Sequence, residues 1–226
     1  MKHLIILLFV GLISFQVNAQ MKETRRLPAF SQLSVSQSIE VELVKGSEER
    51  AEITSDEVDL EDILTEVSGS KLKIHLDGWN RNWKGSIKVR LTYRELEGVS
   101  VGSSAKVTAE ETINATSFYA DASSSGRMSL AVNCSDLEVD VSSSGRVTLR
   151  GRATFQEIDG SSSGYYDGFD LESEKVRADV SSSGKVNVSV SRELMADVSS
   201  SGRVTYKGTP DRLIADQNSS GKVVRY

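Results

Sequence analysis

The chain has 226 residues, a formal net charge of −5 and a globular composition, with 38% hydrophobic and 26% charged residues. One cysteine and two histidines exclude an internal disulfide framework, a cysteine-rich zinc site and a multi-histidine metal centre. We therefore expect no catalytic residues, no cofactor and no metal ion. The acidic balance also argues against nucleic acid as a partner.

Residues 1–19 have the pattern of a secretory signal peptide. Lys2 and His3 precede an apolar run from Leu4 to Val17, and the segment ends in the small residue Ala19. The run is shorter than the roughly 20 apolar residues that span a bilayer, and no later run is long and apolar enough to do so. We expect cleavage after Ala19 and an exported protein that resides in the periplasm, at the cell surface or outside the cell.

Residues 20–98 lack the repeat described below and are expected to form a β-rich cap. Alternation of apolar and polar residues predicts short strands, which fall at 33–36, 39–43, 51–54, 72–76 and 87–91. Residues 58–64 suit a short helical turn capped by Ser55 or Asp56. His75 alternates with inward-facing apolar neighbours, so we expect it to face solvent without a chemical role.

Both tryptophans, Trp79 and Trp83, lie in a polar loop within this region. Exposed aromatic rings stack on sugars or anchor protein contacts. The same rings can instead fold over the end of a core, and the sequence leaves both interpretations open. We treat Trp79 and Trp83 as candidate ligand contacts.

A repeat dominates the rest of the chain. Ser-Ser-Ser-Gly recurs five times, Asn218–Gly221 is a sixth copy, and 102–105 (Gly-Ser-Ser-Ala) is a degenerate earlier one. The closing glycines stand at 126, 145, 164, 184, 202 and 221, at steps of 18 to 20 residues. Alternating strand patterns flank each copy, so the unit is strand, tight turn, strand and looser turn.

Such a unit cannot bury its apolar face alone, and stacked copies predict an all-β solenoid with about 19 residues per coil over residues 99–226. The leucine and asparagine ladder of leucine-rich repeats is absent, and a propeller blade needs about 40 residues. Cys134 lies between two predicted strands, and we expect a structural role for it rather than pairing with another chain.

Stacking converts the repeat into columns of serine, of aspartate and of basic residues. The aspartates are Asp121, Asp140, Asp159, Asp179, Asp197 and Asp216, and the bases are Lys106, Arg127, Arg146, Lys185, Arg203 and Lys222. We interpret these columns as a solvated, charge-balanced face, with a calcium row and a lyase-like cleft as alternatives. Tyr165 interrupts the basic column, and we expect a contact patch around it.

The segments Phe30–Leu43, Ser68–Ile74 and Ile87–Tyr93, followed by repeated Ser-Ser-Gly-Lys/Arg-Val units, resemble the head GIN domain family of auto-transporter adhesins, which is common in Bacteroidota. The resemblance covers about residues 27–226. It implies one domain with a right-handed parallel β-helical fold, export and an adhesive role. It supplies no catalytic motif.

We therefore expect a non-catalytic, exported binding module that contacts a glycan or a protein. Two alternatives remain open, a carbohydrate-active β-helix enzyme such as a lyase and a structural subunit that self-assembles. The second alternative uses the strand edge near the C-terminus, residues 222–226, where homo-oligomers are possible because the sequence shows no capping helix there.

Overall fold

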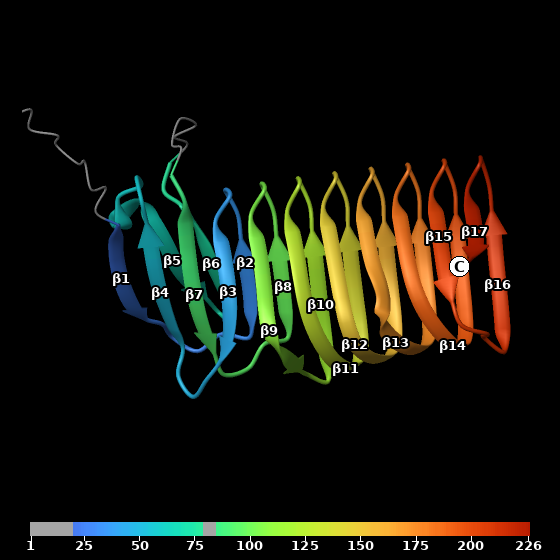
Figure 1. Ribbon diagram of the computed structural model, residues 1–226, viewed down its shortest axis with the longest axis horizontal. Helices are drawn as coiled ribbons and strands as arrows, with labels where there is room; N and C mark the ends of the chain where they lie inside the picture. Colours follow the sequence, from blue (N-terminus) through green and yellow to red (C-terminus); the bar gives the residue numbers. More distant parts are fainter. Residues whose placement is uncertain (1–19, 79–84) are drawn as a thin grey trace, which may run out of the picture.

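The computed structural model describes residues 20–78 and 85–226, which form an elongated β-solenoid (Figure 1). The predicted signal peptide and both candidate tryptophans, Trp79 and Trp83, lie outside the described residues. The described chain contains many strands and one short 3₁₀ helix. Among these residues, no helix is long and apolar enough to cross a lipid bilayer.

The elements are β1 (Met21–Arg26), β2 (Gln32–Val35), β3 (Glu40–Lys45), β4 (Arg50–Ser55), η1 (Leu60–Asp62), β5 (Ile63–Ser68), β6 (Lys71–Leu76), β7 (Ile87–Tyr93), β8 (Gly98–Val101), β9 (Lys106–Asn114), β10 (Ser117–Ala122), β11 (Arg127–Val141), β12 (Arg146–Gly160), β13 (Tyr165–Val180), β14 (Lys185–Val198), β15 (Arg203–Lys207), β16 (Arg212–Gln217) and β17 (Lys222–Arg225).

Two ladders of parallel strands face each other across a thin core. The pre-turn sheet holds the strands that lead into the serine turns: β6, β2, β8, β10, the C-terminal halves of β11–β14, and β16. The post-turn sheet holds the strands that leave them: β7, β3, β9, the N-terminal halves of β11–β14, β15 and β17. Alternate residues of both sheets are buried between them, which confirms the predicted solenoid.

On the side opposite the serine turns, the coil has no separate second turn. Each of β11 to β14 is 14 to 16 residues long and curves from one sheet into the other (Figure 1). The looser turn that the sequence predicts is therefore wrong for these coils. Cys134 accordingly lies within β11, where it is partly buried.

Eight stacked turns form one edge of the solenoid. In each of them two consecutive residues adopt positive φ, for example Ser143 at 48° and Ser144 at 64°, and all non-glycine residues with positive φ in the described chain belong to these turns. L-amino acids disfavour this conformation. Backbone bonds between neighbouring turns, such as Ser125 N–H to the Ser143 carbonyl at 3.1 Å, help to hold it.

The turn glycines serve a different purpose from the one that the sequence suggests. Gly145 does not have positive φ, but a Cβ there would lie 2.1 Å from the carbonyl oxygen of Ala122 on the preceding coil. The glycine thus permits close stacking, while serines adopt the left-handed conformation. In the degenerate copy, Ala105 occupies this position and is fully buried.

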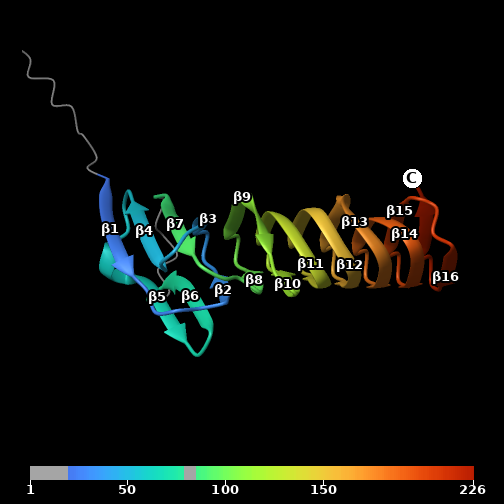
Figure 2. The ribbon, with the colours of Figure 1, turned by 90° about the horizontal axis from the view of Figure 1, so that it is seen from below.

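The N-terminal region places its strands in an order that differs from the chain order. The β2–β3 coil lies between β6–β7 and β8–β9, and its turn at Gln37 and Ser38 joins the same file as the serine turns. Antiparallel strands close this end, with β1 and β4 beside β7, and β5 beside β6 (Figure 2).

The predicted helical turn is shorter than expected. It is the 3₁₀ turn η1, and no side chain caps its N-terminus at Asp59. The Ser55 hydroxyl instead accepts from the Val58 N–H at 3.1 Å and donates to the Val58 carbonyl at 2.7 Å.

Candidate binding face

The predicted aspartate column exists on the outer side of the pre-turn sheet. Consecutive coils place these residues opposite one another, from Asp121 and Asp140 through to Asp216. Burial, followed by the charge of Asp140, raises the pKa of both Asp121 and Asp159 above its usual value. The described residues contain no group of three or more histidine, cysteine or carboxylate side chains able to hold a metal ion.

The basic column lies on the outer side of the other sheet. Its register runs Lys106, Arg127, Arg146, Tyr165, Lys185, Arg203 and Lys222. The aspartates and the bases therefore occupy opposite sides of the core, and the charge acting on Asp121 from a base is that of Lys71. The expected single charge-balanced face is replaced by an acidic side and a basic side.

Tyr165 is half-buried within the basic column. The Arg146 guanidinium lies 4.7 Å from its ring centroid, and Asn187 Nδ2 donates to its hydroxyl at 3.0 Å. Its ring is thereby fixed, with a cation beside it. The structure thus places this predicted contact residue on the outer surface, whereas its neighbour Tyr166 is fully buried.

A second aromatic group lies on the same sheet farther from the turns. The rings of Phe169 and Tyr226 are 5.1 Å apart between centroids, and Lys207 Nζ lies 4.3 Å from the former centroid and 5.0 Å from the latter. We call Tyr165, Phe169, Lys207 and Tyr226 the aromatic patch. Tyr226 is 79% exposed, so the patch offers a ring to solvent.

Sequence reasoning missed Lys207 and Tyr226. Phe169 stands in the aromatic segment after Tyr165, but its partner Tyr226 lies 57 positions later (226 − 169) and not at the repeat spacing. The strand register between β13 and β14 shifts between Gly168 and Glu172. Such a bulge displaces side chains from their periodic columns.

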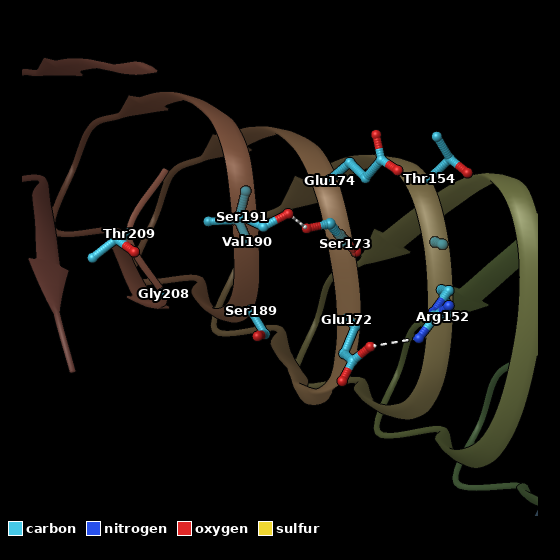
Figure 3. Close-up of a pocket in the computed structure, with 11 residues that line it drawn as sticks. Arg152, Thr154, Glu172, Ser173, Glu174, Ser189, Val190, Ser191, Gly208 and Thr209 are labelled. Atoms are coloured by element: carbon cyan, nitrogen blue, oxygen red, sulfur yellow. Dashed lines mark hydrogen bonds and ion pairs between the residues drawn. The ribbon is translucent and has the colours of Figure 1, made fainter. Parts of the chain in front are cut away.

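An open hollow of about 390 Å³ lies where β12, β13 and β14 curve between the sheets (Figure 3). Arg152 and Glu172 in its lining form an ion pair of 2.9 Å, and the Ser191 hydroxyl donates to the Ser173 carbonyl at 3.1 Å. Arg192 also binds Glu174 at 2.9 Å. Both arginines of this region are bound to carboxylates of the neighbouring coil.

A buried polar chain lies inside these coils. The Tyr166 hydroxyl donates to Gln156 Oε1 at 2.7 Å, and Gln156 Nε2 donates to the Ser173 hydroxyl. Burial raises the pKa of Tyr166 far above its usual value. These three groups satisfy one another within the core.

The remaining candidates have ordinary surroundings. Burial, followed by the charge of Asp136, raises the pKa of Cys134 to about 11, so its thiol is protonated at neutral pH. His75 points outward from β6 and lies 3.2 Å from Glu66.

Comparison with known proteins matches residues 29–210 to the family described as "Putative auto-transporter adhesin, head GIN domain". No curated protein matches the chain. A crystal structure of a putative adhesin from Bacteroides fragilis NCTC 9343 is similar, with a TM-score of 0.86, 18% identity, and coverage of 93% of this chain and 98% of that one.

Two structures from Parabacteroides distasonis ATCC 8503 are also similar. One is a putative adhesin with a TM-score of 0.71 and 19% identity, covering 92% of this chain and 98% of that one. The other is a putative lipid binding protein with a TM-score of 0.73 and 18% identity, covering 92% and 96%. At such identities the likeness establishes a shared fold.

Proposed function

Because the chain belongs to the head GIN domain family of putative auto-transporter adhesins, we propose that it is a non-catalytic, exported module that binds a glycan through the aromatic patch. The observation that carries this proposal is the fixed and partly exposed set of rings on the post-turn sheet, accompanied by Lys207 and Asn187. Rings stack on the apolar faces of sugars, while amide and ammonium groups bond to hydroxyls. Export follows from the signal peptide pattern of residues 1–19.

The short, regular coils favour binding over polysaccharide cleavage. A lyase requires a base that is free to take a proton from the sugar. In the hollow between β12 and β14, Arg152 and Arg192 are bound to glutamates. The outer side of the post-turn sheet offers rings and cations on a gently curved surface that suits an extended ligand.

A glycan array with the mature protein tests the proposal. We expect binding to at least one glycan class, and Tyr165→Ala or Tyr226→Ala should weaken it about tenfold, equivalent to about 1.4 kcal/mol. Tyr119→Ala on the opposite sheet is the matched control and should bind normally. Trp79→Ala and Trp83→Ala test the other predicted contacts. Equal binding by all variants would refute the aromatic patch, and turnover of a polysaccharide would refute the non-catalytic assignment.

Self-assembly is a second candidate, favoured by one observation. The large hydrophobic side chains that are exposed in the described chain, Leu213, Ile214, Val224 and Tyr226, all lie at the β16–β17 end. The outer edges of these strands pair with no other described strand. Exposed edges of this kind recruit further strands. Light scattering should then show a dimer that Ile214→Lys dissociates, and a monomer at high concentration would refute it.

A further inference from the structure

The basic column forms a straight file of cations along the length of the solenoid. Parallel strands place its members about 4.8 Å apart, and Lys106, Arg127, Lys185, Arg203 and Lys222 are all exposed. Within the described part of the chain, none of these five forms an ion pair. Arg146 contacts the ring of Tyr165.

Other arginines of the same coils behave differently. On the remaining rows they bind a glutamate of the neighbouring coil, as in Arg152–Glu172, Arg177–Glu157, Arg192–Glu174 and Arg212–Glu193. Unpaired like charges about 5 Å apart repel by about 1 kcal/mol in water. The chain thus neutralises its charges between coils elsewhere but leaves this file uncompensated.

We propose that the basic file binds a linear anionic polysaccharide, a uronate or a sulfated polymer, that lies parallel to the solenoid axis. This inference rests on the proposed function and specifies the class of glycan. Regularly spaced anions on the polymer would meet regularly spaced cations and relieve their repulsion. Tyr165, in the middle of the file, supplies a ring for one sugar unit. The adjacent outward row offers hydroxyl and amide groups for sugar hydroxyls, from Ser129, Thr148, Asn187 and Thr205.

An anionic membrane is the competing partner for a basic surface. The charge distribution argues against it, because the chain has a net charge of −5 and carries its aspartate column on the opposite sheet. The cations form a single file rather than a broad patch. The exposed hydrophobic side chains lie at the β16–β17 end instead of along the file.

Calorimetric titration with polygalacturonate and with chondroitin sulfate tests the proposal. The variant Arg127→Gln/Lys185→Gln/Arg203→Gln removes three file cations. The matched control Arg152→Gln/Arg177→Gln/Arg192→Gln removes the same charge from paired positions. We expect at least one polymer to bind, the file variant to bind at least tenfold more weakly and the control to stay within twofold. The slope of log affinity against log salt should fall by about 2 in the file variant, at about 0.7 per lost contact.

Three results would overturn the inference. They are equal losses in the file variant and the control, binding to neither polymer, and binding to phosphatidylglycerol vesicles without binding to the polymers. Methyl-esterified polygalacturonate separates this inference from the function on which it rests. If that neutral polymer binds as tightly as the acid and loses affinity with Tyr165→Ala, the glycan-binding function stands and the basic file is not its site.

Discussion

The regular coils from β10 to β17 and the N-terminal region from β1 to β9 build one continuous stack by different means. In the regular coils each strand pairs with the strand about 19 residues away, and every coil repeats the same turn. In the N-terminal region β2 pairs with β6 and with β8, which lie far along the chain, and antiparallel strands close the end.

The difference shows that a repeat is needed for tight stacking but not for membership of the stack. The coil formed by β2 and β3 has no glycine at its turn, where Ile39 takes that place, and still aligns with its neighbours. The regular coils approach so closely that a Cβ at the last turn position would strike a carbonyl. Three substitution pairs test this comparison.

The largest contrast should come from adding one methyl group to a glycine in each region. Gly145→Ala would place a Cβ 2.1 Å from the Ala122 carbonyl oxygen, whereas a Cβ at Gly102 meets only the Ser123 hydroxyl at 3.7 Å. We expect Gly145→Ala to lower the free energy of unfolding by about 3 kcal/mol and Gly102→Ala to change it by less than about 0.5 kcal/mol. Urea denaturation measures both, and similar losses would show that stacking is equally loose throughout.

The second contrast concerns two buried tyrosines. Tyr166→Phe in the regular coils leaves Gln156 Oε1 without its donor and should cost about 1–3 kcal/mol. Tyr93 in the N-terminal region has a buried hydroxyl without a partner among the described residues, so Tyr93→Phe should be neutral or stabilising. Thermal unfolding compares the two, and a greater loss for the Tyr93 variant would contradict the assigned bonding.

The smallest contrast has opposite signs in the two regions. The raised pKa of Asp159 means that the folded state holds the proton more readily, so this carboxyl costs stability as pH rises above about 3.8. The hydrogen bond from Arg25 lowers the pKa of Glu23, which therefore stabilises the fold above about pH 4.5 and loses that contribution in acid.

At pH 7 we expect Asp159→Asn to stabilise and Glu23→Gln to destabilise, each by a few tenths of a kcal/mol because both groups are well exposed. Both differences should vanish near pH 3. Urea titrations at the two pH values measure them. Two changes of the same sign at pH 7 would show that the columns do not repel as described.

The sequence predicts the regular coils well because each glycine reports a close contact with the preceding coil. The register of Asp140 with Asp159, and of Arg127 with Arg146, follows directly from the repeat. The position of β2 and β3 does not follow, since alternating apolar residues show which face is buried but not which strand lies alongside. The candidate site was half predicted, because Tyr165 breaks a periodic column whereas Tyr226 reaches Phe169 across a bulge.

The placement of the β2–β3 coil also bears on the order of folding. Regular coils contact chain neighbours, so they can form one after another at little loop-closure cost. The β2–β3 coil must be in position before β8–β9 can join β6–β7, and this arrangement requires long-range closure. We therefore expect the N-terminal region to supply the slow, rate-limiting step, with the regular coils propagating from it.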